Sequence, residues 1–171
     1  MVGNLVRVQH ELAETRADLK AVERENLHFT VKFLGEVPEG IVEEVDARLR
    51  GLAPAAFEVV VRGVGAFPDP RRPRVVWAGV SRESEPAIEG AASAYAGALE
   101  GLGRPEDHGF HAHITLARVR SPANADRLAS FIGRNGLRDL GRTMVTRLKL
   151  KSSVLSPTGP SYTDLREYAL A

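Results

Sequence analysis

The feature that most constrains this chain is a three-residue pattern, His-x-Thr, that occurs twice in segments with the apolar alternation of a β-strand. The first copy is His28-Phe29-Thr30 and the second is His113-Ile114-Thr115. Chance accounts for about 0.2 such triplets in a chain of this composition. Residues i and i+2 of a strand lie on the same face, so each copy places an imidazole beside a hydroxyl. We interpret the repeat as an internal duplication with one functional histidine in each half.

Composition restricts the class of protein. A length of 171 residues suits one domain or two small lobes that share a core, and we take residues 1–171 as a single bilobal domain. No apolar run approaches the roughly 18 residues of a membrane span, so no membrane association is expected. The absence of cysteine excludes disulfides and thiolate chemistry, and it fits a cytoplasmic protein.

The net charge of +1 conceals two stretches, 62–82 and 134–151, in which basic residues far outnumber acidic ones. Such stretches are compatible with ordinary solvated surface. They are also compatible with a basic rim that attracts a phosphate-bearing ligand. The sequence leaves both readings open.

Periodicity and turn residues predict interleaved helices and strands. The predicted helices are 4–20, 38–51, 84–102 and 122–132, and the predicted strands are 27–35, 57–61, 74–80, 111–119, 143–155 and 161–170. The predicted turns and loops are 63–68, 69–73, 104–109 and 156–160. This order predicts an α+β fold with two pseudo-symmetric antiparallel-sheet lobes, helices on the outside and a central cleft.

Two histidines on facing strands suit cleavage of a phosphodiester without a metal. One neutral imidazole can remove a proton from the nucleophile while one imidazolium protonates the leaving oxygen. Histidine suits both roles because its pKa lies near neutral pH. The hydroxyls of Thr30 and Thr115 can donate to phosphate oxygens, and Arg118 could contact the same phosphate.

Other roles for these residues compete with this one. A single histidine on such a strand is more often structural, but two copies on polar faces favour chemistry. A metal site built on His108, His111 and His113 would need ligands from Glu106 or Asp107, and we do not favour it. Strict alternation places Arg118 on the face opposite His113, so Arg118 joins the site only if the strand ends or bulges near Ala117.

The stretches ENLHFTVKFLGEV, GVGAFPDPRRPRVVWAGV, FHAHITLARV and LSPTGPSYTDLREYAL resemble the 2H phosphoesterases, specifically the RNA 2′,3′-cyclic phosphodiesterases historically called 2′-5′ RNA ligases. The resemblance spans residues 25–170. It implies His28 and His113 as catalytic residues, with Thr30, Thr115 and Arg118 as substrate-binding residues. Phe33 is similar to a position that stacks on the terminal base, although alternation also permits core packing. No metal and no cofactor are implied.

The implied reaction is hydrolysis of an RNA 2′,3′-cyclic phosphate end to a 2′-phosphate, with weak reverse 2′-5′ ligation. RNA with such ends, or nucleoside 2′,3′-cyclic phosphates, would be the substrates. Two alternatives stay open. One is a phosphodiesterase acting on a 2′-5′ oligonucleotide or a nucleotide-sugar cyclic phosphate. The other is a nucleotide- or RNA-binding module without physiological catalysis.

One departure from the family concerns the start of the chain. Relatives usually open with a short strand, whereas this sequence is helical from its first residues. We expect a monomer, and an exposed sheet edge would lower its stability or support an edge-mediated dimer.

Overall fold

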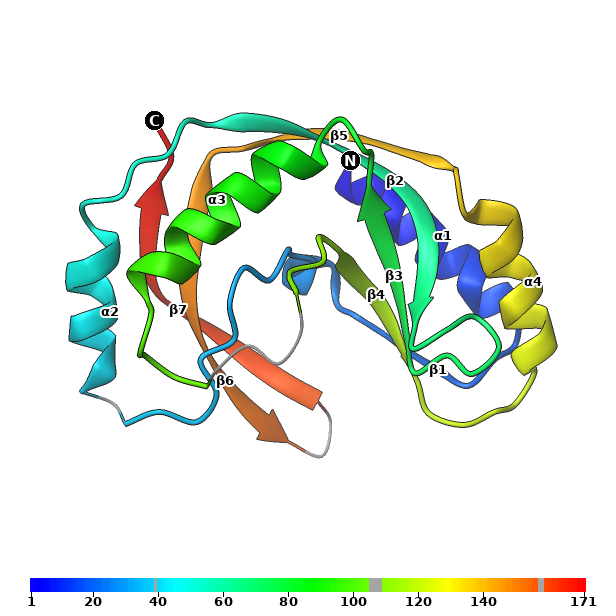
Figure 1. Ribbon diagram of the computed structural model, residues 1–171. Helices are drawn as coiled ribbons and strands as arrows, with labels where there is room; N and C mark the ends of the chain where they lie inside the picture. Colours follow the sequence, from blue (N-terminus) through cyan, green and yellow to red (C-terminus); the bar gives the residue numbers. More distant parts are fainter. Residues whose placement is uncertain (39, 105–108, 157–158) are drawn as a thin grey trace. The chain divides into compact units, whose positions relative to one another are not determined.

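The computed structural model describes residues 1–38, 40–104, 109–156 and 159–171, and the chain divides into two compact units (Figure 1). Unit 1 comprises Met1–Thr30, Glu58–Pro86 and His111–Thr143. Unit 2 comprises Val31–Phe57, Ala87–Phe110 and Met144–Ala171. Both copies of the His-x-Thr motif therefore belong to unit 1.

The order of elements confirms the expected α+β class. The helices are α1 (Val2–Glu14), α2 (Ile41–Leu49), α3 (Glu85–Ala98) and α4 (Ala125–Asn135), with a 3₁₀ turn at Arg24–Asn26. The strands are β1 (Leu19–Ala21), β2 (Phe57–Phe67), β3 (Val75–Val80), β4 (Ile114–Val119), β5 (Asp139–Val145), β6 (Arg147–Ser156) and β7 (Gly159–Ala169). None of the helices in the described ranges is long and apolar enough to cross a membrane.

Unit 1 is built on a five-stranded sheet of order β1-β4-β3-β2-β5, in which β4 pairs antiparallel with both β1 and β3. The helices α1 and α4 both belong to this unit, and each is amphipathic, with one buried apolar face. The inward faces of sheet and helices form one apolar core. It consists of Leu5, Val8, Leu12, Val59, Val61, Val64, Ala66, Val76, Ala78, Ile114, Leu116, Ala117, Leu128, Phe131, Ile132 and Leu140.

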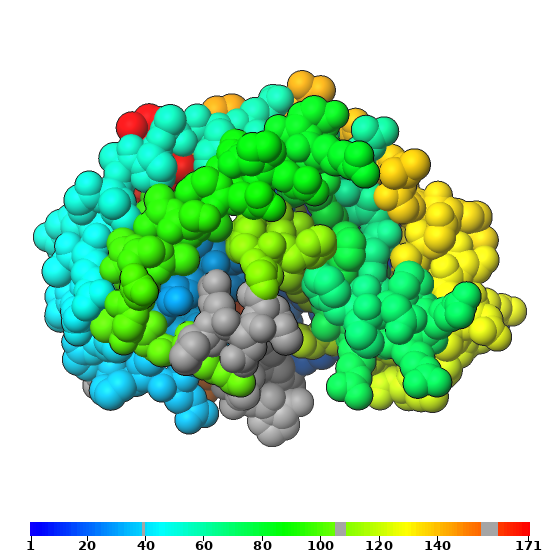
Figure 2. Space-filling model, viewed as in Figure 1, coloured from blue at the N-terminus to red at the C-terminus, as the bar shows by residue number. Residues whose placement is uncertain are grey.

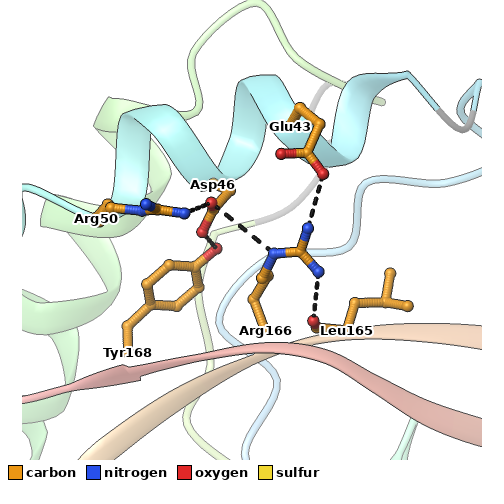
Figure 3. Close-up of polar contacts among 6 residues, drawn as sticks. All are labelled: Glu43, Asp46, Arg50, Leu165, Arg166 and Tyr168. Atoms are coloured by element: carbon orange, nitrogen blue, oxygen red, sulfur yellow. Dashed lines mark hydrogen bonds and ion pairs between the residues drawn. The ribbon is translucent and has the colours of Figure 1, made fainter.

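Unit 2 contains the antiparallel pair β6-β7, α2 and most of α3. Its core holds Val45, Leu49, Tyr95, Leu99, Leu102, Tyr168 and Leu170. A buried carboxylate, Asp46 of α2, accepts a 3.0 Å hydrogen bond from the hydroxyl of Tyr168 and pairs with Arg50 (Figure 3). Arg166 approaches the same carboxylate and also pairs with Glu43 at 2.7 Å. This network ties α2 to β7.

Burial acts to raise the pKa of Asp46, but the hydrogen bonds from Arg50 and Tyr168 hold it below its ordinary value overall. Burial, together with the hydrogen bond to Asp46, raises the pKa of Tyr168 to about 12. The carboxylate is therefore charged at neutral pH in spite of its burial, because its lone pairs are satisfied by cations and a hydroxyl.

The structure corrects the predicted elements in four places. The helix predicted over 4–20 ends at Glu14, and Leu19–Ala21 forms β1 instead. Arg16 lies between them with a φ of 58°, a left-handed conformation that ends a helix. The strand predicted over 27–35 is reduced to one isolated bridge at Phe29, and the sequence analysis did not find β5.

The fourth correction concerns β2, which continues through the predicted 63–68 turn to Phe67. The strand absorbs Gly63 as a bulge, since its pairing with β3 shifts between Val61 and Val64. Gly63 has a φ of 81°, and a Cβ there would lie 2.5 Å from the carbonyl oxygen of Gly136. The predictions for Glu106, Asp107, His108 and the centre of the 156–160 turn lie outside the described residues.

Candidate active site

The two His-x-Thr motifs meet through one antiparallel bridge, between Phe29 and Ile114. Extended by one residue on either side, this register sets His28 opposite Thr115 and Thr30 opposite His113. Ile114 is 1% exposed and faces the core, so its neighbours along the strand face outward. Each histidine thus lies beside the threonine of the other motif, on one outward face of unit 1.

Both histidines are held by the same local hydrogen bond. Nδ1 of His28 donates to the carbonyl oxygen of Asn26, and Nδ1 of His113 donates to the carbonyl oxygen of His111, each at 2.7 Å. Because a carbonyl can only accept, this contact places a proton on Nδ1 and leaves Nε2 for chemistry. Nε2 of His28 lies 3.2 Å from the hydroxyl oxygen of Thr30.

His113 has an aromatic environment. Its ring lies edge-on to Phe67 with centroids 5.0 Å apart, 6.4 Å from Trp77, and stacked on His111 at 6.1 Å. Loss of solvent is the main reason that the pKa of His113 lies below its ordinary value. The hydrogen bond to the His111 carbonyl opposes this shift, and the imidazoles of His111 and His28 lower the pKa further.

A lowered pKa keeps His113 neutral near pH 7, with an unprotonated Nε2 able to accept a proton. The neighbouring Thr30 and Thr115 provide hydroxyl donors beside the two rings. The site therefore contains an imidazole suited to accept a proton, a second imidazole beside it, and hydroxyl donors suited to an anionic group. That combination is what transfer of a phosphoryl group needs.

Arg118 shares the face of His113, because β4 contains the bulge that the sequence analysis named as a condition. Trp77 of β3 pairs with Thr115, and Val75, two residues along β3, pairs with Arg118, three residues along β4. Val75 and Trp77 point to the same side of β3. Their partners Thr115 and Arg118 consequently point to the same side of β4, and Leu116 is the extra residue.

Gln9 is a residue that sequence reasoning missed. It lies on the buried face of α1, and its side-chain amide donates to the carbonyl oxygens of Leu116 at 2.8 Å and of Val22 at 2.7 Å. Leu116 is the bulge residue, and its carbonyl oxygen also accepts a 2.9 Å hydrogen bond from the backbone N–H of Val22. The available signal was a glutamine between Val8 and Leu12 on an otherwise apolar helix face.

Trp77 packs against Gly65 and Gly79 on the strands next to His113. The indole ring covers Gly65 so closely that a Cβ at that position would overlap it. Trp77 also lies 5.2 Å from Phe67 and 5.2 Å from His111, ring centroid to ring centroid. Nothing in the sequence alone linked these residues to the second motif, because the contacts depend on the pairing of β2, β3 and β4.

Phe33 belongs to unit 2 and is 67% exposed. Core packing, the alternative for this side chain, is therefore wrong. Stacking of Phe33 on a base stays a prediction.

The alternative of a metal site finds no support within the described ranges, where no group of three or more His, Cys, Asp or Glu side chains could hold an ion. Of the residues named for it, His108, Glu106 and Asp107 lie outside those ranges. A metal-independent reaction stays a prediction.

The two basic stretches differ in how far carboxylates neutralise them. In the 134–151 stretch the ion pairs are Arg138–Glu11, Arg142–Glu58, Arg147–Glu167, Lys149–Asp164 and Lys151–Asp164. In the 62–82 stretch the exposed Arg71, Arg72 and Arg74 form no ion pair with any described residue. The segment that carries them stands out from the surface of unit 1 in the green tones of Figure 2. Among the described residues of the two stretches, Arg134 is the member of 134–151 without a carboxylate partner, so most of the unpaired positive charge lies in 62–82.

Comparison with known proteins identifies the family of the chain. Residues 2–77 match the family model of the LigT-like phosphoesterases. RNA 2′,3′-cyclic phosphodiesterase of Aeropyrum pernix is 37% identical over all of this chain and 97% of its own length. The protein of the same name from Methanothermobacter thermautotrophicus is 38% identical over 96% of this chain and 89% of its length.

Solved structures show the same fold. TT0787 of Thermus thermophilus matches with a TM-score of 0.78 and 32% identity, over 99% of this chain and 91% of that one. LigT of Escherichia coli, solved with 3′-AMP, matches with a TM-score of 0.75 and 22% identity, over 99% and 92% of the two chains. The fold and these relatives define the class of protein as a phosphodiesterase. More particularly, the chain belongs to the 2H phosphoesterases, in the family of RNA 2′,3′-cyclic phosphodiesterases.

Proposed function

We propose that this enzyme hydrolyses the 2′,3′-cyclic phosphate at the end of an RNA chain, or of a nucleoside 2′,3′-cyclic phosphate, to a 2′-phosphate and a free 3′-hydroxyl. The observation that carries the proposal is the crossed arrangement of the motifs, in which each histidine lies beside the threonine of the other copy. The names of the relatives supply the substrate class.

In the proposed reaction His113 is the base. Its neutral Nε2 takes a proton from water as the water oxygen attacks phosphorus. The P–O3′ bond breaks, and His28 gives the proton on its Nε2 to O3′. One water is consumed, the 2′-phosphate keeps its bond to O2′, and solvent exchange restores the starting protonation of the two rings.

Thr30 and Thr115 donate to the non-bridging phosphate oxygens, where negative charge concentrates during attack. Arg118, brought to this face by the bulge in β4, adds a charged donor able to contact two oxygens. The reverse reaction, in which a 5′-hydroxyl replaces water and a 2′-5′ linkage forms, uses the same groups in opposite roles.

Product analysis tests the proposal. The enzyme is incubated in EDTA with an oligoribonucleotide that ends in a 2′,3′-cyclic phosphate, and the product is identified by mass and by its resistance to a 3′-phosphatase. We expect the 2′-phosphate, and no product with His28→Ala or His113→Ala. A 3′-phosphate, or activity that EDTA abolishes, contradicts the mechanism. Tight binding without turnover by the wild type favours the binding-module alternative.

A further inference from the structure

The loop that joins β2 to β3, residues 68–74, is strongly basic. It contains Arg71, Arg72 and Arg74 against one acid, Asp69. All three arginines are exposed, and none of them forms an ion pair with another residue that the structure describes. This segment, which we name the arginine loop, therefore presents three guanidinium groups to solvent in a short stretch of unit 1.

The acid of the loop shapes the backbone instead of pairing with a guanidinium. Oδ1 of Asp69 accepts hydrogen bonds from the backbone N–H of Arg71 at 2.8 Å and of Arg72 at 3.2 Å. An aspartate that accepts bonds from the following backbone in this way holds a turn, and Pro70 and Pro73 restrict the backbone further. The arginines thus stand on an ordered turn, which lowers the entropy lost when a ligand binds them.

Both ends of the arginine loop lie close to the second motif. Phe67, the last residue of β2, contacts the ring of His113 edge-on. At the other end of the loop, the backbone N–H of Arg74 donates to the carbonyl oxygen of Phe67 at 2.7 Å. Arg71 follows Phe67 by four residues, so the two lie at most about 14 Å apart. At 3.4 Å for each stacked nucleotide, about four nucleotides of a strand that ends at His113 span this distance.

The chemistry of the arginine loop favours phosphates as its ligands. A guanidinium group presents two parallel N–H donors that match two oxygens of one phosphate. Exposed cations without acidic partners are also the groups that neutralise a nucleic-acid backbone and release its counterions. The 134–151 stretch offers no comparable cluster within the described residues, because carboxylates pair with all of its cations except Arg134.

We propose that the arginine loop binds the ribose-phosphate backbone of the RNA upstream of the cyclic end, with Arg71 and Arg72 as its phosphate contacts. The inference rests on the proposed function, which places the cyclic end at His28 and His113. The contact is independent of base sequence, because it is made to phosphates and not to base edges. An RNA of several nucleotides is consequently a better substrate than a nucleoside 2′,3′-cyclic phosphate, which lacks upstream phosphates.

The kinetic test compares kcat/KM for adenosine 2′,3′-cyclic phosphate with kcat/KM for an oligoadenylate octamer that ends in the same cyclic phosphate. Arg71→Gln/Arg72→Gln should lower the value for the octamer roughly tenfold and leave the value for the nucleoside unchanged. Arg71→Lys/Arg72→Lys should keep most of the wild-type value for the octamer, since the charge is retained. Equal losses on both substrates, or no loss on the octamer, overturn the proposed contact.

The matched control removes the same charge from another part of unit 1. Arg127 and Arg134 of α4 are exposed, and neither has a carboxylate partner among the residues described. Arg127→Gln/Arg134→Gln should leave kcat/KM for both substrates at the wild-type values. A loss on the octamer as large as that of the loop variant would show an effect of net charge alone, and it would overturn the assignment to the arginine loop.

A binding measurement separates failure of the arginine loop from failure of the proposed function. The probe is the oligoadenylate octamer with a terminal 2′-phosphate, titrated at several salt concentrations. We expect log Kd to depend less steeply on log salt in Arg71→Gln/Arg72→Gln, by about 1.4, because each phosphate contact to a single strand contributes about 0.7. If the wild type turns over neither substrate, the proposed function fails and this slope alone decides the contact. An unchanged slope overturns it.

Discussion

The two copies of the His-x-Thr motif have similar sequences and different surroundings. The second copy leads into β4, a strand paired on both sides, and its histidine lies against Phe67, Trp77 and His111. The first copy follows a 3₁₀ turn and is joined to the sheet by a single bridge. The hydrogen bond at Nδ1 is the same in both histidines. The two sites therefore differ in the side chains around each ring and in the solvent that these side chains exclude.

This difference teaches how a duplicated motif can supply two chemical roles. Where the environments of two identical groups differ, the difference indicates which acts as acid and which as base. The aromatic neighbours withdraw solvent from His113 and lower its pKa, which suits a base. Under the proposed function, His28 is then the group left to donate the proton.

The largest effect is expected from removal of either ring. His28→Ala and His113→Ala should each lower kcat for the cyclic phosphate by about 10²- to 10⁴-fold. The double variant should be little worse than the poorer single variant, because acid and base act in one step. Steady-state kinetics on a nucleoside 2′,3′-cyclic phosphate measures all three. Full additivity of the two losses would argue that the rings do not act together.

Loss of a threonine hydroxyl should have a smaller effect. Thr30→Val and Thr115→Val remove one donor each at nearly constant shape, and we expect kcat to fall about 10- to 100-fold, at or below the range for loss of one oxyanion donor. Thr→Ser at the same position should recover most of the rate. If Thr→Ser is as poor as Thr→Val, the methyl group rather than the hydroxyl matters.

The buried amide of Gln9 is expected to affect both stability and the second motif. Gln9→Leu removes the amide donor from the Leu116 and Val22 carbonyls, of which the Leu116 carbonyl keeps the backbone N–H of Val22, and this should cost about 1–3 kcal/mol of unfolding free energy. Because that donor supports the bulge that orients Arg118, KM for an RNA substrate should also rise. Urea denaturation measures the first effect and kinetics the second.

The neighbouring His10→Leu is the matched control for Gln9→Leu. His10 is exposed on the same helix, so His10→Leu should change the unfolding free energy of the protein by no more than about 0.5 kcal/mol. A Gln9→Leu enzyme as stable as the wild type would remove the role assigned to the amide.

The smallest effect is a shift in pH dependence. A base whose pKa is lowered stays unprotonated at more acidic pH. The midpoint of the acidic limb of the kcat/KM profile should therefore lie below the ordinary histidine pKa of about 6.5. Phe67→Ala should readmit water to His113, raise its pKa and move that limb to higher pH. An acidic limb at the same pH in Phe67→Ala would show that solvent exclusion by Phe67 does not lower the pKa of His113.

Sequence reasoning found the residues of the motif, since period-two alternation and the chemistry of histidine are local properties. It also anticipated that Arg118 needs a bulge near Ala117, and β4 shifts register at that point. It failed where pairing overrides local pattern. Residues 27–35 alternate like a strand, yet they form only one bridge, because alternation describes a strand without supplying a partner.

The strand β1 and the role of Gln9 escaped notice for related reasons. Leu19 and Lys20 were assigned to a helix that ends before them, so the pairing of β1 with β4 could not be foreseen. The role of Gln9 depends on a carbonyl 107 residues away in the sequence. Contacts of this kind follow from strand order, which a single sequence does not specify.

The measurement that tests the division of roles most directly compares leaving groups. His28→Ala and His113→Ala are assayed on the cyclic phosphate and on a phosphodiester whose leaving group is nitrophenolate, which needs no protonation. We expect His28→Ala to regain most of its activity on the nitrophenyl ester, whereas His113→Ala should stay inactive. Equal loss on both substrates in His28→Ala, or recovery in His113→Ala, would contradict the assignment of His28 as acid and His113 as base.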